Sequence, residues 1–457
     1  MDAPCLLELL KKVIDSLLDR GVRVVSYASD GTEIERAVQR LFLDLTNEQI
    51  YTIQNPRPGC VDTKVVFGIY RGQAICMVQD SKHALKTFRN NLFSGARLLT
   101  FGNYTAMYRH ILEIAQGDGT PLFSRDVNKV DRQDDNAASR LFSADILQYL
   151  AVNHPEYIGD IVYLFVFGEL VDAYQNRSMS HVERLRLVLR ARYFLDSWEA
   201  YLRVCGYRKD QYCLSREALD ITRIIINGFI ALVIIHRDHT PGTCVLLPWL
   251  HSSEACEHVF GESRQVVKDF TYLDFIYMIP KLRIKLHQAA FRGKASNPKA
   301  RAAGYAHTYF DNDGLDWATL STFPTNSEIQ AVAEEAAQEA DSLVALLGIN
   351  AERLHRFQAS NPQSQWLPAI NSWFRDDDLG GVDQNIECDL VADFDAKYDY
   401  ENEAEELQKV LDQEENSPIT RSRRLDEKCM NLTAATLALA ADETIQMFVH
   451  CFLLVCF

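Results

Sequence analysis

Three acidic residues in the sequence could bind divalent cations: Asp30, Asp80 and Glu257. Asp30 ends the run VRVVSYASD and Asp80 ends QAICMVQD, and α/β folds place their chemistry at the C-terminal ends of strands. Two-metal phosphoryl transfer needs carboxylates that hold two Mg²⁺ or Mn²⁺ ions ~3.5–4 Å apart. Hard oxygen ligands suit those ions, and the sequence has no Cys/His cluster at zinc spacing. The three residues are therefore candidates for catalytic metal ligands, although their spacing in the sequence is weak evidence by itself.

Each of these residues also has a structural explanation that involves no metal. An aspartate that follows a strand often caps the next helix, and for Asp30 or Asp80 alone this explanation is the stronger one. Glu257 alone is most simply a solvated position on a helix. Because both aspartates follow strands, a metal site accounts for them as well as these structural explanations do. The residues that surround the three carboxylates favour the metal site further.

The residues around the three carboxylates resemble the motifs of P-element-like and THAP-type DNA transposases. DSKHALKTFRNNL, which starts at Asp80, resembles the family motif D-P-P-H-L-x-K-x-x-R-N. VVSYASDG, which contains Asp30, resembles the strand that carries the family's second catalytic aspartate. SSEACEHVFGESR resembles the D-x-x-E-x-x-F-x-x-I-R helix and places the catalytic glutamate on Glu257, with Phe260 and Arg264 at the later positions.

These motifs follow the family's order over residues 20–290, and their order is more specific than any one of them. RQDDNAASRLFSADIL resembles the start of the helical insertion in these enzymes. DFTYLDFIYMIPKL and ARAAGYAHTYFD resemble fungal-type members. In the family pattern the Asp80 motif lies beside the site, so we rank Asp30 and Glu257 above Asp80 as metal ligands.

Membership of this family implies a cut-and-paste DNA transposase with an RNase H-like core, which cleaves and transfers DNA strands with Mg²⁺ or Mn²⁺ and binds transposon ends. P-element enzymes also use GTP. The sequence has no G-x-x-x-x-G-K-S/T loop and no residue can be assigned to GTP, so that cofactor stays open. A homo-oligomer is also left open, and the expected location is the nucleus or the cytoplasm.

The family pattern also predicts a defect. An RNase H-like core begins with a three-stranded meander whose first strand bears the first catalytic aspartate, but only 21 residues precede the VRVVSYASD strand. We therefore expect an N-terminally truncated remnant that lacks the first metal ligand and is catalytically incomplete. One alternative is a non-enzymatic DNA-binding or protein-interaction domain derived from a transposase. Another is an unrelated α/β enzyme that uses its strand-end aspartates differently.

The elements around these residues are predicted to be α/β at the front of the chain and helical behind it. Apolar spacing and β-branched runs predict helices over 6–18 and 32–45, strands over 22–28, 64–70 and 73–79, and helices over 144–153, 158–175, 181–205 and 215–235. Arg71-Gly72 is a predicted hairpin turn. We accordingly divide the chain into a partial RNase H-like core with a mixed sheet (1–103), an all-helical insertion (104–245), a returning core with the glutamate helix (246–374) and an acidic, mostly disordered tail (375–457).

The net charge of −16 is concentrated in one segment. Residues 375–415 contain 16 Asp/Glu and 3 Lys/Arg, which leaves a charge of −3 on the rest of the chain. A near-neutral body can still bind a phosphate backbone through a local basic surface. The acid-free run after the glutamate helix is the best candidate, and its basic residues include Lys281, Arg283, Lys285, Arg292 and Lys294. For the arginines of the 181–193 helix we favour ion pairs with nearby acids over DNA contacts.

The remaining features favour an intracellular protein without a membrane span. The eleven cysteines form no C-x-x-C pair, and the N-terminal residues form an amphipathic helix pattern rather than a signal peptide. The most apolar stretch, 224–235, is about a dozen residues long and is interrupted by Asn227 and Gly228, whereas a bilayer span needs ~20 residues.

Overall fold

The computed structural model describes residues 2–128, 131–242, 244–292 and 314–360, without the side chains of 288–292. A mixed sheet contains β1 (Ser26–Ser29), β2 (Asn47–Ile53), β3 (Thr63–Tyr70) and β4 (Gln73–Gln79), in the order β1-β4-β3-β2. β1 pairs with β4 in parallel, whereas β2 with β3 and β3 with β4 pair in antiparallel fashion. Because β1 and β4 run in the same direction, the residues that follow them lie at the same end of the sheet.

Most of the predicted strands are confirmed, with two differences. The hairpin between β3 and β4 turns at Arg71 and Gly72, whose φ angles of 48° and 82° suit a two-residue hairpin turn. β1 begins later than Val22, because the Val24 N–H donates to the Gln73 side chain (3.1 Å) rather than to a neighbouring strand. β2 was not predicted, because most of its residues are exposed and it has no apolar alternation.

The helices before the glutamate helix are α1 (Ala3–Asp19), α2 (Glu33–Leu43), α3 (Ser81–Phe93), α4 (Tyr108–Ile114), α5 (Ser124–Val127), α6 (Asp135–Leu141), α7 (Ala144–Asn153), α8 (Ile158–Gln175), α9 (His181–Val204), α10 (Lys209–Tyr212) and α11 (Arg216–Ile234). A short hairpin, β5 (Leu99–Phe101) and β6 (Tyr104–Ala106), precedes α4, so the segment 104–245, which was predicted to be all-helical, begins with a strand. The predicted helices over 144–153, 158–175, 181–205 and 215–235 are therefore confirmed to within a residue or two.

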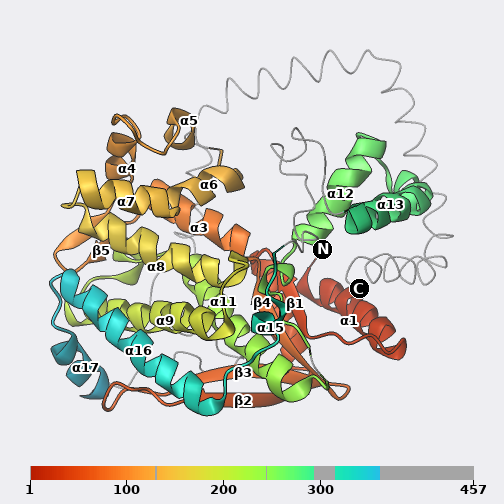
Figure 1. The fold of residues 1–457 in the computed structure, drawn as a ribbon, viewed down its shortest axis with the longest axis horizontal. Coiled ribbons are helices and arrows are strands. Elements are labelled where there is room, and N and C mark those ends of the chain that lie inside the picture. The colour runs from red at the N-terminus through yellow and green to blue at the C-terminus, as the bar shows by residue number, and fades with distance from the viewer. Residues whose placement is uncertain (1, 129–130, 243, 293–313, 361–457) are drawn as a thin grey trace. The chain divides into compact units, whose positions relative to one another are not determined.

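Helices cover both faces of the sheet, with α1 on one side and α8, α9 and α11 on the other (Figure 1). Alternate side chains of β3 and β4 divide between two cores, as the period of two in a strand requires. Val66 and Met77 pack under α1 and α2. Val65 and Val78 belong to the larger core, which the sheet shares with the helices from α3 to α11.

α11 packs against the sheet through Asn227 and Gly228, the two residues that interrupt its apolar sequence. The Asn227 side chain donates to the Val66 carbonyl oxygen and accepts from the Val66 N–H, both at 2.9 Å. A Cβ at position 228 would lie 2.7 Å from the Met77 carbonyl oxygen, so glycine permits this close approach. An interior packing role therefore explains both residues.

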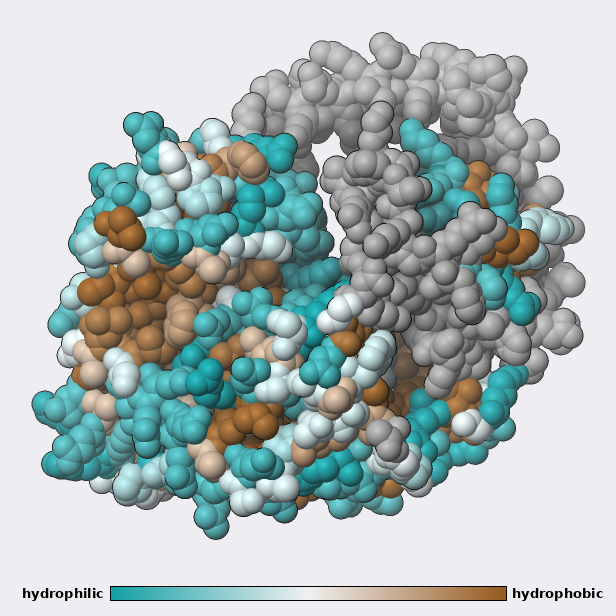
Figure 2. Space-filling view, viewed as in Figure 1, coloured by the Kyte–Doolittle hydropathy of each residue, from teal (hydrophilic) through white to brown (hydrophobic). Residues whose placement is uncertain are grey.

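Residues 216–239 form one helix, since α11 continues into η1 (Ile235–His239), and this length exceeds the dozen apolar residues predicted. By length and composition this helix could cross a membrane, but 94% of its most apolar 18-residue window is buried inside the protein. The core helix of a folded domain has the same properties. Figure 2 shows apolar residues on the face over α8, where Ile161 and Phe165 are partly exposed.

The chain then continues through η2 (Pro248–Leu250), α12 (Glu254–Val266), α13 (Tyr272–Arg292), α15 (Trp317–Leu320), α16 (Asn326–Leu346) and α17 (Ala351–Ser360). α16 packs along α9. The described residues all belong to one compact unit, 1–374. The acidic segment 375–415 lies outside the described residues.

Candidate functional site

Asp30 and Asp80 lie side by side at the ends of the two parallel strands. Ser29 and Gln79, the last residues of β1 and β4, are register partners. The Asp80 N–H donates to the Ser29 carbonyl oxygen at 2.8 Å, which extends the ladder by one residue. The strand-end placement predicted from the sequence is confirmed for both aspartates.

Asp80 also caps the following helix. Its Oδ1 accepts from the N–H groups of Lys82 (2.8 Å) and His83 (3.0 Å) at the start of α3. Asp30 has no such role, because Thr32 caps α2 in a capping box with Glu35. The sequence alone suggested that each aspartate caps the helix after it. This helix-capping explanation is correct for Asp80 and wrong for Asp30.

Glu257 reaches the two aspartates through a serine that precedes it by one helical turn. The Ser253 Oγ lies 2.6 Å from Asp30 Oδ1, 3.1 Å from Asp80 Oδ2 and 3.3 Å from Glu257 Oε1. The Ser253 N–H donates to Asp80 Oδ2 at 2.8 Å. The structure therefore brings the three predicted carboxylates together around one hydroxyl group.

The charge state of Glu257 reflects these neighbours. Its pKa is raised by partial burial and by the negative charges of Asp80 and Asp30, whereas Lys86 acts in the opposite direction. Burial is the largest of these causes, although more than a third of the Glu257 residue is exposed to solvent. A cation placed among the three carboxylates would relieve their repulsion.

The carboxylate and hydroxyl oxygens of this cluster are atoms that a hard divalent cation binds, but the three carboxylates are not placed to coordinate one ion directly. Carboxylate and hydroxyl oxygens are the ligands that Mg²⁺ and Mn²⁺ prefer. In residues 2–360, where the structure describes them, no group of three or more His, Cys, Asp or Glu side chains is placed so that it could hold a metal ion directly. The three carboxylates meet through Ser253 instead.

Two lysines of α3 stand at the rim of this cluster and pair with acids. Lys82 Nζ lies 2.7 Å from Glu254 Oε1, in the first turn of α12, and Lys86 Nζ lies 3.1 Å from Asp135 Oδ1. Both lysines come from the D-x-x-H-x-x-K motif that starts at Asp80. Positive side chains beside an acidic cluster can hold an anionic group against it.

Two further residues position the site and were not assigned a role from the sequence. Ser253 lies four residues before Glu257, and this helical spacing was the available signal in the sequence. His251 Nδ1 lies 2.7 Å from Ser26 Oγ and so ties the chain before α12 to β1. Burial and the neighbouring His236 lower the pKa of His251 to about 3, so this ring is neutral at physiological pH.

The last residues of the Asp80 motif have a structural role away from the carboxylates. The buried Arg89 guanidinium donates to the carbonyl oxygens of Asp134 (3.0 Å) and Asp131 (2.6 Å). Asn90 donates to the Arg132 carbonyl oxygen at 3.4 Å. Together they fasten α3 to the segment before α6, which is the start of the predicted insertion.

The arginines of α9 are bound inside the protein. Arg184 is fully buried and donates to the Ala173 carbonyl oxygen at 2.6 Å. Arg190 pairs with Glu339 of α16 at 2.9 Å and also with Glu169. These contacts favour the ion-pair interpretation over the DNA interpretation. Arg184, Arg190 and Arg192 are buried, whereas Arg186, which also pairs with Glu339, is partly exposed.

The predicted basic surface after the glutamate helix is described in part. Lys281 and Arg283 of α13 are exposed to solvent. Lys285 is engaged, because its Nζ lies 2.8 Å from Glu262 Oε2 of α12. The Arg292 side chain and Lys294 lie outside the described residues.

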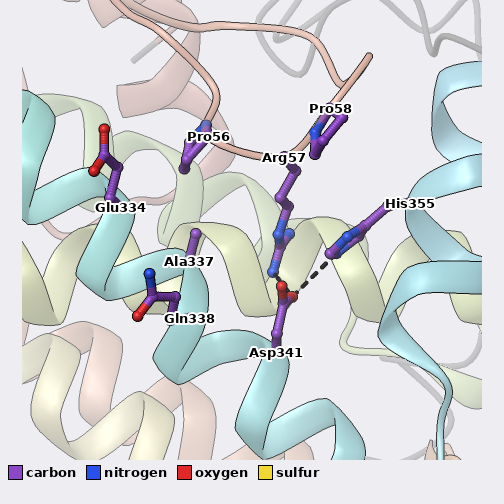
Figure 3. Close-up of a pocket in the computed structure, with 8 residues that line it drawn as sticks. All are labelled: Pro56, Arg57, Pro58, Glu334, Ala337, Gln338, Asp341 and His355. Atoms are coloured by element: carbon purple, nitrogen blue, oxygen red, sulfur yellow. Dashed lines mark hydrogen bonds and ion pairs between the residues drawn. The ribbon is translucent and has the colours of Figure 1, made fainter.

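A cavity of about 330 Å³ lies elsewhere, between the loop after β2 and the helices α16 and α17. Figure 3 shows Arg57 and His355 pointing toward the carboxylate of Asp341. Asp341 Oδ1 lies 2.6 Å from Arg57 Nη2 and 3.0 Å from His355 Nε2. These ion pairs join the loop to both helices, which indicates a structural role.

Comparison with models of known protein families, with curated proteins and with solved structures finds no match for this chain. The family resemblance therefore depends on the motifs, and the case for a function depends on the geometry around Ser253.

Proposed function

We propose that this chain derives from a cut-and-paste DNA transposase and that Asp30, Asp80 and Glu257 are the divalent-cation ligands of its catalytic domain. The convergence of these three carboxylates on the Ser253 hydroxyl supports the proposal most directly. The residues follow β1 and β4 or belong to α12, which are far apart in the sequence, and the family motifs place catalytic carboxylates at Asp30 and Glu257, with the Asp80 motif beside the site.

The finer fold assignment belongs to the same proposal. The parallel β1–β4 pair, with an aspartate after each strand, is the arrangement expected at the centre of an RNase H-like core. The helices from α4 to α11 lie between Asp80 and Glu257 in the sequence, as a helical insertion would. We infer a partial RNase H-like core interrupted by that insertion.

A bound Mg²⁺ or Mn²⁺ would activate the attacking hydroxyl and stabilise the leaving oxygen of a phosphodiester. Asp30 and Glu257 would supply the oxygens that orient the cation. Asp80 caps α3, the helix that carries Lys82 and Lys86, and these lysines pair with Glu254 and Asp135 beside the cluster. These lysines would position the phosphate, since lysine ammonium groups bind phosphate oxygens.

DNA would approach along α13, where Lys281 and Arg283 are exposed directly after the glutamate helix. Neutralisation of backbone phosphates by such side chains supplies most of the affinity in sequence-independent DNA binding. Transposon ends are the DNA partner that the family resemblance implies.

One observation favours a second candidate, a transposase-derived domain that binds DNA without turnover. Within the described ranges no three metal-binding side chains are placed to hold an ion directly, and a serine hydroxyl stands between the carboxylates.

A strand-cleavage assay distinguishes the two candidates. The full chain is incubated with Mn²⁺ and labelled duplex DNA that carries candidate terminal repeats, beside the variants Glu257→Ala and Glu335→Ala. Glu335 is an exposed glutamate of α16 and serves as a matched control. We expect DNA binding with little or no cleavage. Efficient cleavage that is lost only in Glu257→Ala would instead establish a working nuclease.

A further inference from the structure

The hydroxyl of Ser253 is used differently from those of other residues that begin helices in the described part of the chain. Ser143, Ser180, Ser215 and Thr325 each accept a hydrogen bond from a backbone N–H in the first turn of their helix. Ser253 makes no side-chain cap bond to α12. Its hydroxyl points to the carboxylates instead, so it contributes to the site at the expense of its own helix.

Ser253 lies against Oδ2 of Asp80 through both its backbone N–H and its hydroxyl. A carboxylate offers about four lone-pair positions. Oδ1 of Asp80 accepts from the N–H groups of Lys82 and His83, and Oδ2 contacts both the N–H and the hydroxyl of Ser253. A cation that approaches Oδ2 of Asp80 from the side of Asp30 and Glu257 therefore meets the Ser253 hydroxyl and has to displace it.

The same hydroxyl cannot satisfy all three carboxylates. A serine hydroxyl carries one hydrogen, and the shortest contact, 2.6 Å to Asp30 Oδ1, indicates where that hydrogen goes. The oxygens of Asp80 and Glu257, at 3.1 and 3.3 Å, then face the hydroxyl oxygen without a hydrogen from it. The hydroxyl therefore makes one strong hydrogen bond, to Asp30, and the backbone N–H of Ser253 makes another, to Asp80, whereas Glu257 receives no hydrogen from either group and can bind a competing positive charge.

We propose that Ser253 is a latch that holds Asp30, Asp80 and Glu257 together in the metal-free protein and is displaced when a divalent cation binds. This inference rests on the proposed function, because it takes the cluster to be a cation site. Ser253 is a positioning residue and competes with the cation. Its removal should therefore weaken the metal-free protein and strengthen cation binding.

The test compares the full-length wild type with Ser253→Ala, Ser253→Thr and Ser252→Ala. Thermal unfolding is followed by circular dichroism in EDTA and then over a series of Mn²⁺ concentrations. Ser253→Thr keeps the hydroxyl. Ser252→Ala is the matched control, because the Ser252 Oγ accepts only a 3.3 Å contact from the Glu254 N–H at the start of the same helix.

We expect Ser253→Ala to unfold at a lower temperature than wild type in EDTA and to be stabilised by Mn²⁺ at about tenfold lower concentration, the factor expected when one charge-assisted hydrogen bond no longer competes. Ser253→Thr and Ser252→Ala should behave as wild type. If Mn²⁺ clearly raises the unfolding temperature of wild type but stabilises Ser253→Ala only at the same or a higher concentration, the proposed role of Ser253 is wrong, while the cation site stands. No Mn²⁺ response in any of the four proteins would overturn the cation site itself.

Discussion

The Ser253 hydroxyl oxygen lies 2.6 Å from Oδ1 of Asp30, across 223 residues of sequence. This contact joins the end of β1 to the start of α12, and all the helices from α3 to α11 lie between the two in the chain. Only the folded chain brings the carboxylates together. The proximity of the three carboxylates therefore depends on the tertiary structure, and it is a sensitive test of the proposed site.

Replacement of Glu257 by Gln should stabilise the metal-free protein slightly, because it removes one of three neighbouring negative charges. Glu257 is partly exposed, so the gain after solvent screening should be at most about 1 kcal/mol. Urea unfolding in EDTA at pH 7 measures it, with Glu335→Gln as the control. A loss of stability in Glu257→Gln would show that the carboxylate makes favourable contacts that outweigh the repulsion.

Asn227→Leu should destabilise the protein strongly. The substitution leaves the N–H and carbonyl groups of the buried Val66 without their partners, at a cost of about 2–4 kcal/mol in the free energy of unfolding. The control is Asn153→Ala, which removes an exposed hydrogen bond to the Tyr149 carbonyl oxygen and should cost less than about 0.5 kcal/mol. Equal effects of the two substitutions would contradict the packing role of Asn227.

The stability of the protein should decrease below neutral pH, in part because of His181. Burial lowers the pKa of this residue to about 4, and its Nε2 lies 3.0 Å from the Leu320 carbonyl oxygen. The unfolded chain takes up a proton near pH 6.5 that the folded protein excludes until about pH 4. The stabilising contribution is therefore complete above pH 6.5 and is lost between pH 6.5 and 4.

The variant His181→Phe isolates this effect, since phenylalanine keeps a ring beside Phe323 and does not titrate. Between pH 7 and 4.5 the free energy of unfolding of wild type should fall by about 2–3 kcal/mol more than that of His181→Phe. Unfolding in urea at both pH values measures the difference. Parallel pH profiles would show that His181 is protonated normally in the folded protein.

The double substitution Lys281→Ala/Arg283→Ala should weaken binding to duplex DNA of any sequence. Two lost phosphate contacts should reduce the slope of log Kd against log salt by about 2. Fluorescence anisotropy at several salt concentrations gives the slope. Lys12→Ala/Arg353→Ala removes the same charge from α1 and α17 and should leave the slope unchanged. A similar loss in both double variants would indicate that overall charge, not α13, determines DNA binding.

The ends of β1 and β4 and the position of Glu257 near the two aspartates could be predicted from the sequence, because β-branched runs indicate the strands and the order of the motifs indicates the glutamate. The role of Ser253 could not. Ser252 and Ser253 are adjacent and equally suited to begin a helix, and only the orientation of the first turn of α12 decides which hydroxyl faces the aspartates. That orientation depends on His251 and Ser26, which are far apart in the sequence.

Long-range partners explain the other differences. The sequence shows four arginines among the leucines of α9, but Glu339, which binds Arg190, is 149 residues away and could not be identified as a partner. β2 was missed because an exposed edge strand carries no apolar alternation. Asn227 and Gly228 were interpreted as interruptions of an apolar stretch, whereas they are the points at which α11 contacts the sheet.

Calorimetric titration of Mn²⁺ into the metal-free protein tests the central claim most directly. The account predicts saturable binding in wild type that is lost or at least tenfold weaker in Asp30→Asn and Glu257→Gln, while Glu335→Gln binds as wild type. Absence of Mn²⁺ binding in wild type, or equal binding in all four proteins, would contradict the assignment of Asp30, Asp80 and Glu257 as a cation site.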